Sequence, residues 1–253
     1  MKIAFCFLIY DFIIRYDIWN SFFKNIDTEK YCIFIHPKKI LHNKNYESYT
    51  FPYNIVKNII ETKSKDHISI VRAILQLLKE TYQNNENITH FIFLSQSCIP
   101  LYSFDILYQI ISNSKYSIIS SINNNKKERY YQLSTIIKRY INYESFVKQQ
   151  PNMILIRDDM KLLVENDYTN HFNNMSCPDE HYFINILNSI FKRKIIKRQI
   201  HFCNYNFEKT QSLEFYNIDK IFIQKIRNYG FLFMRKVNKN SNINIDFLLN
   251  FKS

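Results

Sequence analysis

The segment 176–183, SCPDEHYF, places a proline, two carboxylates and an imidazole in four consecutive residues. Pro178 suits the first turn of a helix, where its missing N–H removes no hydrogen bond, and acidic residues there complement the helix dipole. The apolar residues that follow have helical spacing: Tyr182, Phe183, Ile186, Leu187 and Ile190. A helix is therefore predicted to begin near Pro178. On this local pattern alone, capping explains Asp179 and Glu180 better than catalysis does, and a general base is the alternative.

The segment 93–105, FLSQSCIPLYSFD, is a second candidate for chemistry. A buried strand is predicted to end in small polar residues that begin with Ser95, and a helix is predicted to begin near Ser103. Ligands of open α/β sheets bind beyond the carboxyl ends of the strands. The segment is therefore either a ligand contact or a plain connecting loop. Cys98 has no activating base nearby in the sequence, so a thiolate nucleophile is not expected.

A pair of cations, Arg235 and Lys236, directly follows the aromatic run in the segment 231–237, FLFMRKV. The chain has a single glycine, Gly230, so neither a dinucleotide-binding glycine motif nor a P-loop can be present. Nucleotide phosphates would then need side-chain cations, and two adjacent cations can hold a diphosphate. The alternative is an ordinary solvated basic pair.

A metal site is not predicted. Asp158 and Asp159 could bind Mg²⁺ through oxygen, but they follow a predicted strand and open a predicted helix, where acidic residues are common caps. The histidines show no ligand spacing.

The composition narrows the class of protein and its partners. The 253 residues carry a formal net charge of +12, which favours a polyanionic partner or a phosphorylated ligand. A basic nucleic-acid-binding or structural protein is thus the alternative to an enzyme. The first apolar run, IAFCFLIY, is too short to span a bilayer and predicts a buried strand of a soluble protein. Five cysteines without a C-x-x-C spacing predict free thiols and a cytoplasmic location.

Secondary-structure patterns alternate along the chain. Apolar runs rich in β-branched and aromatic residues predict strands at 2–10, 31–35, 90–95, 116–120, 152–156 and 194–202. Helical spacing of apolar residues predicts helices at 19–23, 67–82, 104–111 and 178–190. This alternation predicts an α/β fold with a mostly parallel central sheet flanked by helices. Because no repeat or linker divides the chain, a single domain over 1–253 is expected.

In this order, the motifs resemble the core-2/I-branching enzyme family of glycosyltransferases, which includes branching N-acetylglucosaminyltransferases and peptide O-xylosyltransferases. The resemblance covers about residues 2–240 and rests on these segments: KIAFCFLIYD, YCIFIHPKK, SIVRAILQLL, HFIFLSQSCIPLYSFD, PDEHYF and FLFMRK. It implies a GT-A-type fold and an inverting transfer from a UDP-sugar to a hydroxyl of a glycan or protein acceptor. UDP-GlcNAc is the first expected donor and UDP-xylose the second.

The resemblance also implies roles for individual residues. Glu180 matches the catalytic base of the family, and Arg235 and Lys236 match a basic motif that replaces a metal ion at the diphosphate. His36, Arg72 and Ser95 are the further expected donor contacts. Animal members commonly read His-Val-Asp-Lys where this chain reads Ile35-His36-Pro37-Lys38. Neither a metal nor any other cofactor is expected.

The expected acceptor contacts are spread over three segments. Glu128 and Arg129 lie in the loop after the strand predicted at 116–120, and Gln150 and Asn152 precede the next strand. Tyr205, in HFCNYNF, takes the place of a tryptophan that often lines the acceptor site in the family. A glycan or glycoprotein acceptor is the expected partner, without specific nucleic-acid binding and without a transmembrane segment. A scaffold that binds a sugar nucleotide without turnover is a further alternative.

Overall fold

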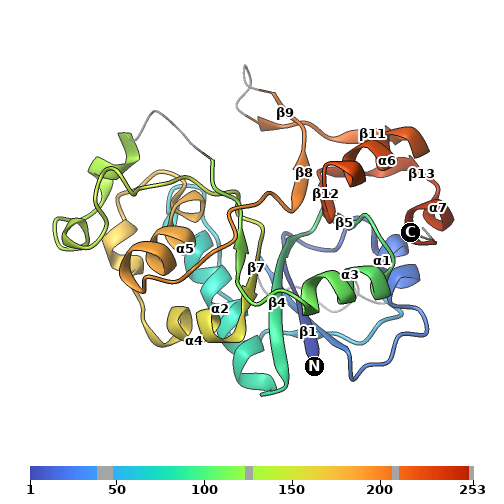
Figure 1. Cartoon of the computed structure of the whole chain (residues 1–253), viewed down its shortest axis with the longest axis horizontal. Coiled ribbons are helices and arrows are strands. Elements are labelled where there is room, and N and C mark those ends of the chain that lie inside the picture. Colours follow the sequence, from blue (N-terminus) through green and yellow to red (C-terminus); the bar gives the residue numbers. More distant parts are fainter. Residues whose placement is uncertain (39–47, 123–127, 207–210, 251–253) are drawn as a thin grey trace.

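The computed structural model describes residues 1–38, 48–122, 128–206 and 211–250 (Figure 1). Its centre is a six-stranded sheet of order β3-β2-β1-β4-β7-β6. The strands are β1 (Lys2–Ile9), β2 (Tyr31–Pro37), β3 (Asn54–Ile55), β4 (Ile88–Ser95), β6 (Ile118–Ile119) and β7 (Met153–Ile156). The pairs β3–β2, β2–β1 and β1–β4 are parallel, whereas β7 is antiparallel to both β4 and β6. Only β7 of these strands runs against the others, so the predicted α/β fold with a mostly parallel central sheet is confirmed.

The strand β1 shows why the apolar runs form this sheet. It lies between β2 and β4, and its residues from Ile3 to Phe7 are buried on both faces. Phe5 and Phe7 face one hydrophobic cluster, while Ala4 and Cys6 face the other. A parallel strand covered on both faces reads as a continuous apolar run rather than as an alternating one.

The helices cover the two faces of the sheet. Figure 1 shows α1 (Tyr16–Phe23) and α3 (Phe104–Ser112) on one side, and α2 (Ile68–Asn84), α4 (Arg157–Glu165) and α5 (Tyr182–Asn185) on the other. The predicted helices at 19–23, 67–82 and 104–111 are thus confirmed, with small differences in their ends. None of the helices in the described ranges is long and apolar enough to cross a membrane.

A second, three-stranded sheet joins distant parts of the chain. Its order is β5 (Ile99–Pro100), β12 (Phe233–Arg235) and β8 (His201–Cys203). The strand β12 is antiparallel to β5 and parallel to β8. Because β5 follows β4 after a short turn, this small sheet carries the C-terminal segment to the carboxyl end of β4, at the top of the central sheet in Figure 1.

The strand predicted at 194–202 is wrong over most of its length. Only His201–Cys203 is paired as a strand, and Ile196 forms a single isolated bridge with Ile118. Most residues from 192 to 199 are exposed, so this segment runs over the surface. Its backbone meets β6 at one point, where the Ile196 N–H donates to the Ser117 carbonyl and the Ile196 carbonyl accepts from the Ile119 N–H. The strand predicted at 116–120 is also shorter than expected, at Ile118–Ile119. The loop predicted to follow it lies partly outside the described residues, at 123–127.

The remaining elements lie near the C-terminus. The strand β9 (Tyr205–Asn206) pairs antiparallel with β10 (Gln211–Ser212), and β11 (Phe215–Ile218) pairs parallel with β13 (Val237–Ile243). Two helices, α6 (Lys220–Asn228) and α7 (Ile245–Leu249), pack near them. In Figure 1, β11, β13, α6 and α7 lie on the same side of the molecule as α1 and α3, and α7 contacts α1.

Candidate active site

The motif PDEHYF opens as a short 3-10 helix. The turn η5 spans Pro178–Glu180, and α5 follows at Tyr182. Cys177 has a φ of 51°, in the left-handed region, so the chain turns sharply before Pro178, and its side chain makes no capping hydrogen bond. A helical segment beginning at Pro178 is confirmed. Its anchor is a set of side chains buried against the face that carries α2: Tyr182, Phe183, Ile184, Ile186 and Leu187.

The carboxylate of Glu180 contacts two cations. Arg129 Nη1 lies 2.6 Å from Glu180 Oε2, and Lys148 Nζ lies 3.0 Å from the same oxygen. Oε1 accepts no hydrogen bond from any residue that the structure describes. The Glu180 side chain is 26% exposed, so solvent or an acceptor can reach it. Capping therefore does not account for Glu180, because its carboxylate binds side-chain cations rather than backbone N–H groups.

The backbone and the next side chain of the motif are fixed by the segment 146–149. The Gln149 N–H donates to the Glu180 carbonyl at 2.7 Å. The His181 ring stacks on Phe146 with centroids 4.8 Å apart, and its Nδ1 lies 3.0 Å from the Val147 carbonyl. A carbonyl only accepts, so Nδ1 carries the proton and Nε2 faces Arg129 Nη1 at 3.4 Å as an acceptor. Burial lowers the pKa of His181 to about 4, which keeps the imidazole neutral near pH 7.

Asp179 is half-buried, and its carboxyl lies between charges of both signs. Burial, followed by the charge of Glu180, raises the pKa of Asp179 to about 6. The charges of Arg129 and Arg235 act in the opposite direction on the same carboxyl. The charge of Arg235 thus reaches the Asp179 carboxyl, although the two residues are far apart in the sequence.

Arg235 ends β12 and is held by Asn152. Its Nη1 donates to Asn152 Oδ1 at 3.3 Å, while Asn152 Nδ2 donates to the Phe93 carbonyl of β4 at 3.2 Å. Asn152 is buried, and Arg235 Nε is buried without a hydrogen-bond partner among the described residues. The short segment 148–152 thus contacts Glu180 at one end and Arg235 at the other. The four steps from the Cα of residue 148 to the Cα of residue 152 span at most about 14 Å in extended chain.

Ser95 lies at the same edge of the sheet as Arg235. It ends β4, and its Oγ is 3.2 Å from Cys98 Sγ, which in turn lies 3.7 Å from Asn152 Nδ2. Cys98 is fully buried, and this burial raises the pKa of its thiol, so a thiolate is not available at neutral pH. Ser95, Asn152 and Arg235 are therefore brought together. The donor contacts of Ser95 and Arg235 and the acceptor contact of the buried Asn152 stay predictions.

Lys236 lies between β12 and β13 and is half-buried. Its carbonyl accepts from the Phe215 N–H at 2.8 Å. Its ammonium group has no carboxylate partner in the described part of the chain. Of the two adjacent cations, Arg235 is thus oriented by Asn152, and Lys236 is open to an anionic ligand.

Two of the expected donor contacts, His36 and Arg72, are bonded to other parts of the chain. His36 is fully buried in β2, where its Nε2 accepts from the Ile60 N–H at 3.0 Å, so it is closed to a ligand in this conformation. Arg72 Nη2 donates to the amide oxygens of Asn170 and Asn173, at 3.4 and 3.1 Å. Neither side chain is bonded to Glu180 or Arg235, although α2, which carries Arg72, packs against the turn Pro178–Glu180. The donor contacts of His36 and Arg72 stay predictions.

The expected acceptor contacts are only partly brought together. Arg129 is on the Glu180 carboxylate, and Gln150 lies within the segment 148–152, with its N–H donating to Ser120 Oγ at 2.7 Å. Glu128 is exposed beside Arg129 in the 3-10 helix Glu128–Gln132. Tyr205 is 42% exposed and follows Cys203, which pairs with Arg235. Contact of these residues with an acceptor stays a prediction.

Sequence reasoning missed Lys148 and the backbone of Gln149, and it assigned Asp179 only to the helix dipole. The one available signal for Lys148 was a lysine four residues before a predicted strand. Its partner Glu180 is distant in the sequence, so only the fold joins them.

Two other features do not make a catalytic site. Asp159 is fully buried and accepts from Ser117 Oγ at 2.6 Å and from Arg193 Nε, and it lies in the first turn of α4 as predicted. The described residues contain no group of three or more His, Cys, Asp or Glu side chains placed to hold a metal ion.

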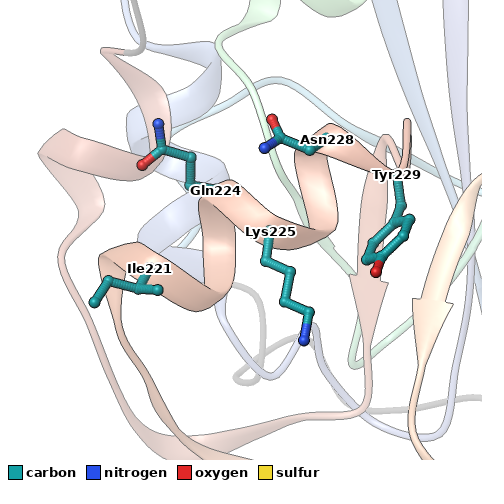
Figure 2. A pocket seen from close by; sticks show the side chains of 5 residues that line it. All are labelled: Ile221, Gln224, Lys225, Asn228 and Tyr229. Carbon is teal, nitrogen blue, oxygen red and sulfur yellow. The ribbon is translucent and has the colours of Figure 1, made fainter.

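A surface pocket on α6, shown in Figure 2, is lined by Ile221, Gln224, Lys225, Asn228 and Tyr229. Its lining has one cation and neither a carboxylate nor an imidazole, so it lacks a carboxylate base of the kind proposed for Glu180.

A known glycosyltransferase is similar to part of the chain. The chain is 28% identical over 152 residues to "Glycosyltransferase BC10" of Oryza sativa subsp. japonica. The match covers 59% of this chain and 37% of that protein, so the chain spans little more than a third of the relative it matches.

Solved structures were also compared with the fold. The galactosyltransferase LgtC, in complex with donor and acceptor sugar analogues, has a TM-score of 0.45 and 12% identity, over 97% of this chain and 85% of that one. Mouse xyloside xylosyltransferase 1 has a TM-score of 0.44 and 8% identity, over 81% of this chain and 89% of that one. At such scores the likeness identifies neither a substrate nor a mechanism.

The family model described as "Core-2/I-Branching enzyme" matches residues 3–229. This range contains Glu180, Arg129, Lys148 and Asn152, and it ends before Arg235 and Lys236. The range covers most of the chain, in agreement with the resemblance of its motifs. The chain therefore belongs to the Core-2/I-Branching enzyme family of glycosyltransferases.

Proposed function

We propose that this protein is an inverting glycosyltransferase that moves a sugar from a UDP-sugar to a hydroxyl of a glycan or protein acceptor. GlcNAc is the first proposed sugar and xylose the second. Family membership supports the transferase class and the GT-A-type assignment. The observation that carries the mechanism is the segment 148–152, which contacts Glu180 through Lys148 and Gln149 and contacts Arg235 through Asn152.

Glu180 is the proposed general base. Its Oε1 takes the proton of the acceptor hydroxyl while the hydroxyl oxygen attacks the anomeric carbon of the donor sugar. The bond between that carbon and the diphosphate breaks as the new glycosidic bond forms, and UDP leaves with the bonding electrons. A single displacement from the opposite face inverts the configuration. The proton on Glu180 then passes to solvent.

Arg235 and Lys236 are the proposed diphosphate contacts. Charge develops on the UDP oxygen as it leaves, and cations fixed at that position stabilise the transition state. Arg235 is oriented by Asn152, and the buried Nε of Arg235 has no partner among the described residues. We propose that these two side chains supply the positive charge for which other sugar-nucleotide enzymes use a metal ion.

Thermal unfolding with UDP, UDP-GlcNAc and UDP-xylose, each with EDTA and with Mn²⁺, tests this proposal. A nucleotide at 100 times its Kd stabilises the folded state by about 2.7 kcal/mol. Equal stabilisation in EDTA and in Mn²⁺ is expected. Arg235→Met and Lys236→Met should each weaken the UDP response, whereas Lys225→Met, on the outer face of α6, should not.

Two results would contradict the proposal in different ways. A UDP response that disappears in EDTA and returns with Mn²⁺ would overturn metal-independent binding. No response to UDP, together with a tight and saturable complex with RNA or DNA at physiological salt, would favour a nucleic-acid-binding protein instead. For binding through charge alone, the logarithm of the association constant falls roughly linearly with the logarithm of the salt concentration.

A further inference from the structure

Two cations from separate segments converge on one oxygen of Glu180. Arg129 belongs to the 3-10 helix Glu128–Gln132, and Lys148 lies in the irregular chain before β7. Their nitrogen atoms lie 2.6 and 3.0 Å from Oε2. The side chains of all three residues are between 26% and 31% exposed. Ion pairs at this exposure add little to stability because solvent screens them. The arrangement is therefore better explained by what it does to the carboxylate.

The two cations give the two carboxylate oxygens of Glu180 different surroundings. Oε2 is shared by two cations, whereas Oε1 has no hydrogen-bond donor in the described ranges. A terminal carboxylate torsion is broad when nothing holds it. Two contacts on one oxygen fix that torsion and direct the other oxygen away from the cations. A general base needs a fixed orientation of this kind, because its oxygen must lie within about 2.6–3.2 Å of the hydroxyl that it deprotonates.

The supports of Lys148 and Arg129 are themselves fixed. The residues on either side of Lys148 are bound to the motif, since the Val147 carbonyl faces His181 Nδ1 at 3.0 Å and the Gln149 N–H donates to the Glu180 carbonyl at 2.7 Å. Asn185 Oδ1 also accepts from the Val147 N–H at 3.0 Å. Arg129 faces the neutral His181 Nε2 at 3.4 Å. The backbone that carries Lys148 therefore cannot move independently of Glu180.

We propose that Lys148 and Arg129 are positioning residues, which hold Glu180 through Oε2 and present Oε1 to the acceptor hydroxyl. This inference rests on the proposed function, in which Glu180 is the base. Neither side chain touches the reacting atoms in this account. Both act through Glu180, and their loss misplaces the base without removing it.

The test uses the whole chain of 253 residues and measures UDP release from UDP-GlcNAc and from UDP-xylose, with water as the acceptor. Lys148→Met and Arg129→Met should each lower kcat by about tenfold or more, because small misplacements of a catalytic group can reduce rate up to about a hundredfold. The KM for UDP-GlcNAc and the UDP thermal shift should stay at the wild-type values. Lys148→Arg should restore most of kcat. The matched controls are Lys161→Met and Arg139→Met, since both side chains are exposed and have no ion-pair partner among the described residues.

A double-mutant comparison separates positioning from other roles. If Lys148 acts through Glu180, Lys148→Met should cause no further loss of kcat in a Glu180→Gln background. The Tm changes of the two single variants should also be non-additive in the double variant. A wild-type kcat in Lys148→Met, a change confined to KM, or an equal loss of kcat in both backgrounds would overturn the inference.

Failure of the proposed function gives a different pattern. Wild-type protein would then release no UDP from either donor, or Glu180→Gln would release it at the wild-type rate. A non-additive Tm in that case would assign the cluster around Glu180 to structure alone, and the positioning role would be rejected with the function.

Discussion

Glu180 and Asp179 are neighbours with different surroundings, and the difference separates their expected roles. Glu180 faces Arg129 and Lys148 through one oxygen, whereas Asp179 is half-buried and its pKa is raised to about 6, first by burial and then by the charge of Glu180. A carboxylate held by cations with one oxygen open can accept a proton from an acceptor. Asp179 is more costly to ionise in the folded protein, and it forms no ion pair with a residue that the structure describes.

Replacing Glu180 with glutamine is the sharpest test at the residue scale. Glu180→Gln keeps the shape of the side chain but removes the base, so transfer or UDP release should fall by about 10² to 10⁴. The thermal shift with UDP should not change, because Arg235 and Lys236 are intact. A variant within threefold or so of wild-type activity would remove the catalytic assignment.

Asp179→Asn is the control for this prediction. A raised carboxyl pKa means that the ionised side chain destabilises the folded state above about pH 6, so the variant should have a higher Tm at pH 7. The difference should shrink as the pH falls through 6. Most of the activity should remain. A large loss of activity in Asp179→Asn, with no loss of activity in Glu180→Gln, would assign the role of general base to Asp179 instead of Glu180.

At the scale of elements, Asn152 joins the two sheets. Its amide donates to the carbonyl of Phe93 in β4 and accepts from Arg235 in β12. The small sheet β5-β12-β8 has few residues, so its place over the carboxyl end of β4 depends on such contacts. Arg235 is therefore positioned by an element that the main sheet supports.

Asn152→Ala should separate this support from catalysis. The variant removes both hydrogen bonds, and we expect a loss of about 1 kcal/mol in the free energy of unfolding. The Kd for UDP should rise several-fold, because Arg235 loses its orienting partner, while kcat at saturating donor should change less. Urea unfolding and calorimetric titration with UDP measure the two effects. Asn228 on α6 is exposed, so the control variant Asn228→Ala should leave both the free energy of unfolding and the Kd for UDP unchanged. An unaltered Kd for UDP in Asn152→Ala would show that other contacts place Arg235.

At the scale of the whole molecule, buried imidazoles control the response to acid. Burial lowers the pKa of His36, His90 and His201, and lowers that of His181 to about 4. The unfolded chain protonates its histidines near pH 6.5. Below that pH the unfolded state takes up protons that the folded state does not, so the free energy of unfolding falls. Asp179 acts oppositely between about pH 6 and 4, but it is a single group.

The free energy of unfolding should therefore be lower at pH 5 than at pH 7, by at least about 2 kcal/mol, the linkage of one such imidazole. His201 is fully buried against Phe233, and neither ring nitrogen has a partner in the described part of the chain. His201→Leu should raise stability at pH 7 by about 1 kcal/mol and should weaken the pH dependence. His67→Leu, at an exposed position, is the control. Equal stability at pH 5 and pH 7 would refute this account.

The sequence by itself determined the frame of the central sheet and the place of the motif. The strands β1, β2 and β4 could be predicted because strands covered on both faces need continuous apolar runs. The helix α2 could be predicted because one face of it is buried and the other is not. The start at Pro178 followed from the restricted backbone of proline and from the apolar residues behind it. These features depend on neighbours in the chain, so local patterns carry them.

Only the tertiary structure decided which side chains meet. Lys148 and Arg129 reach Glu180, and Asn152 reaches Arg235, across long stretches of sequence that leave no periodic signal. The small sheet was not predicted, because β5 and β12 are two and three residues long and pair with distant partners. The run at 194–200 has the composition of a strand but is mostly exposed, and it pairs with β6 at a single residue, Ile196. A strand needs a partner for its backbone N–H and C=O groups, and the fold rather than the composition supplies that partner.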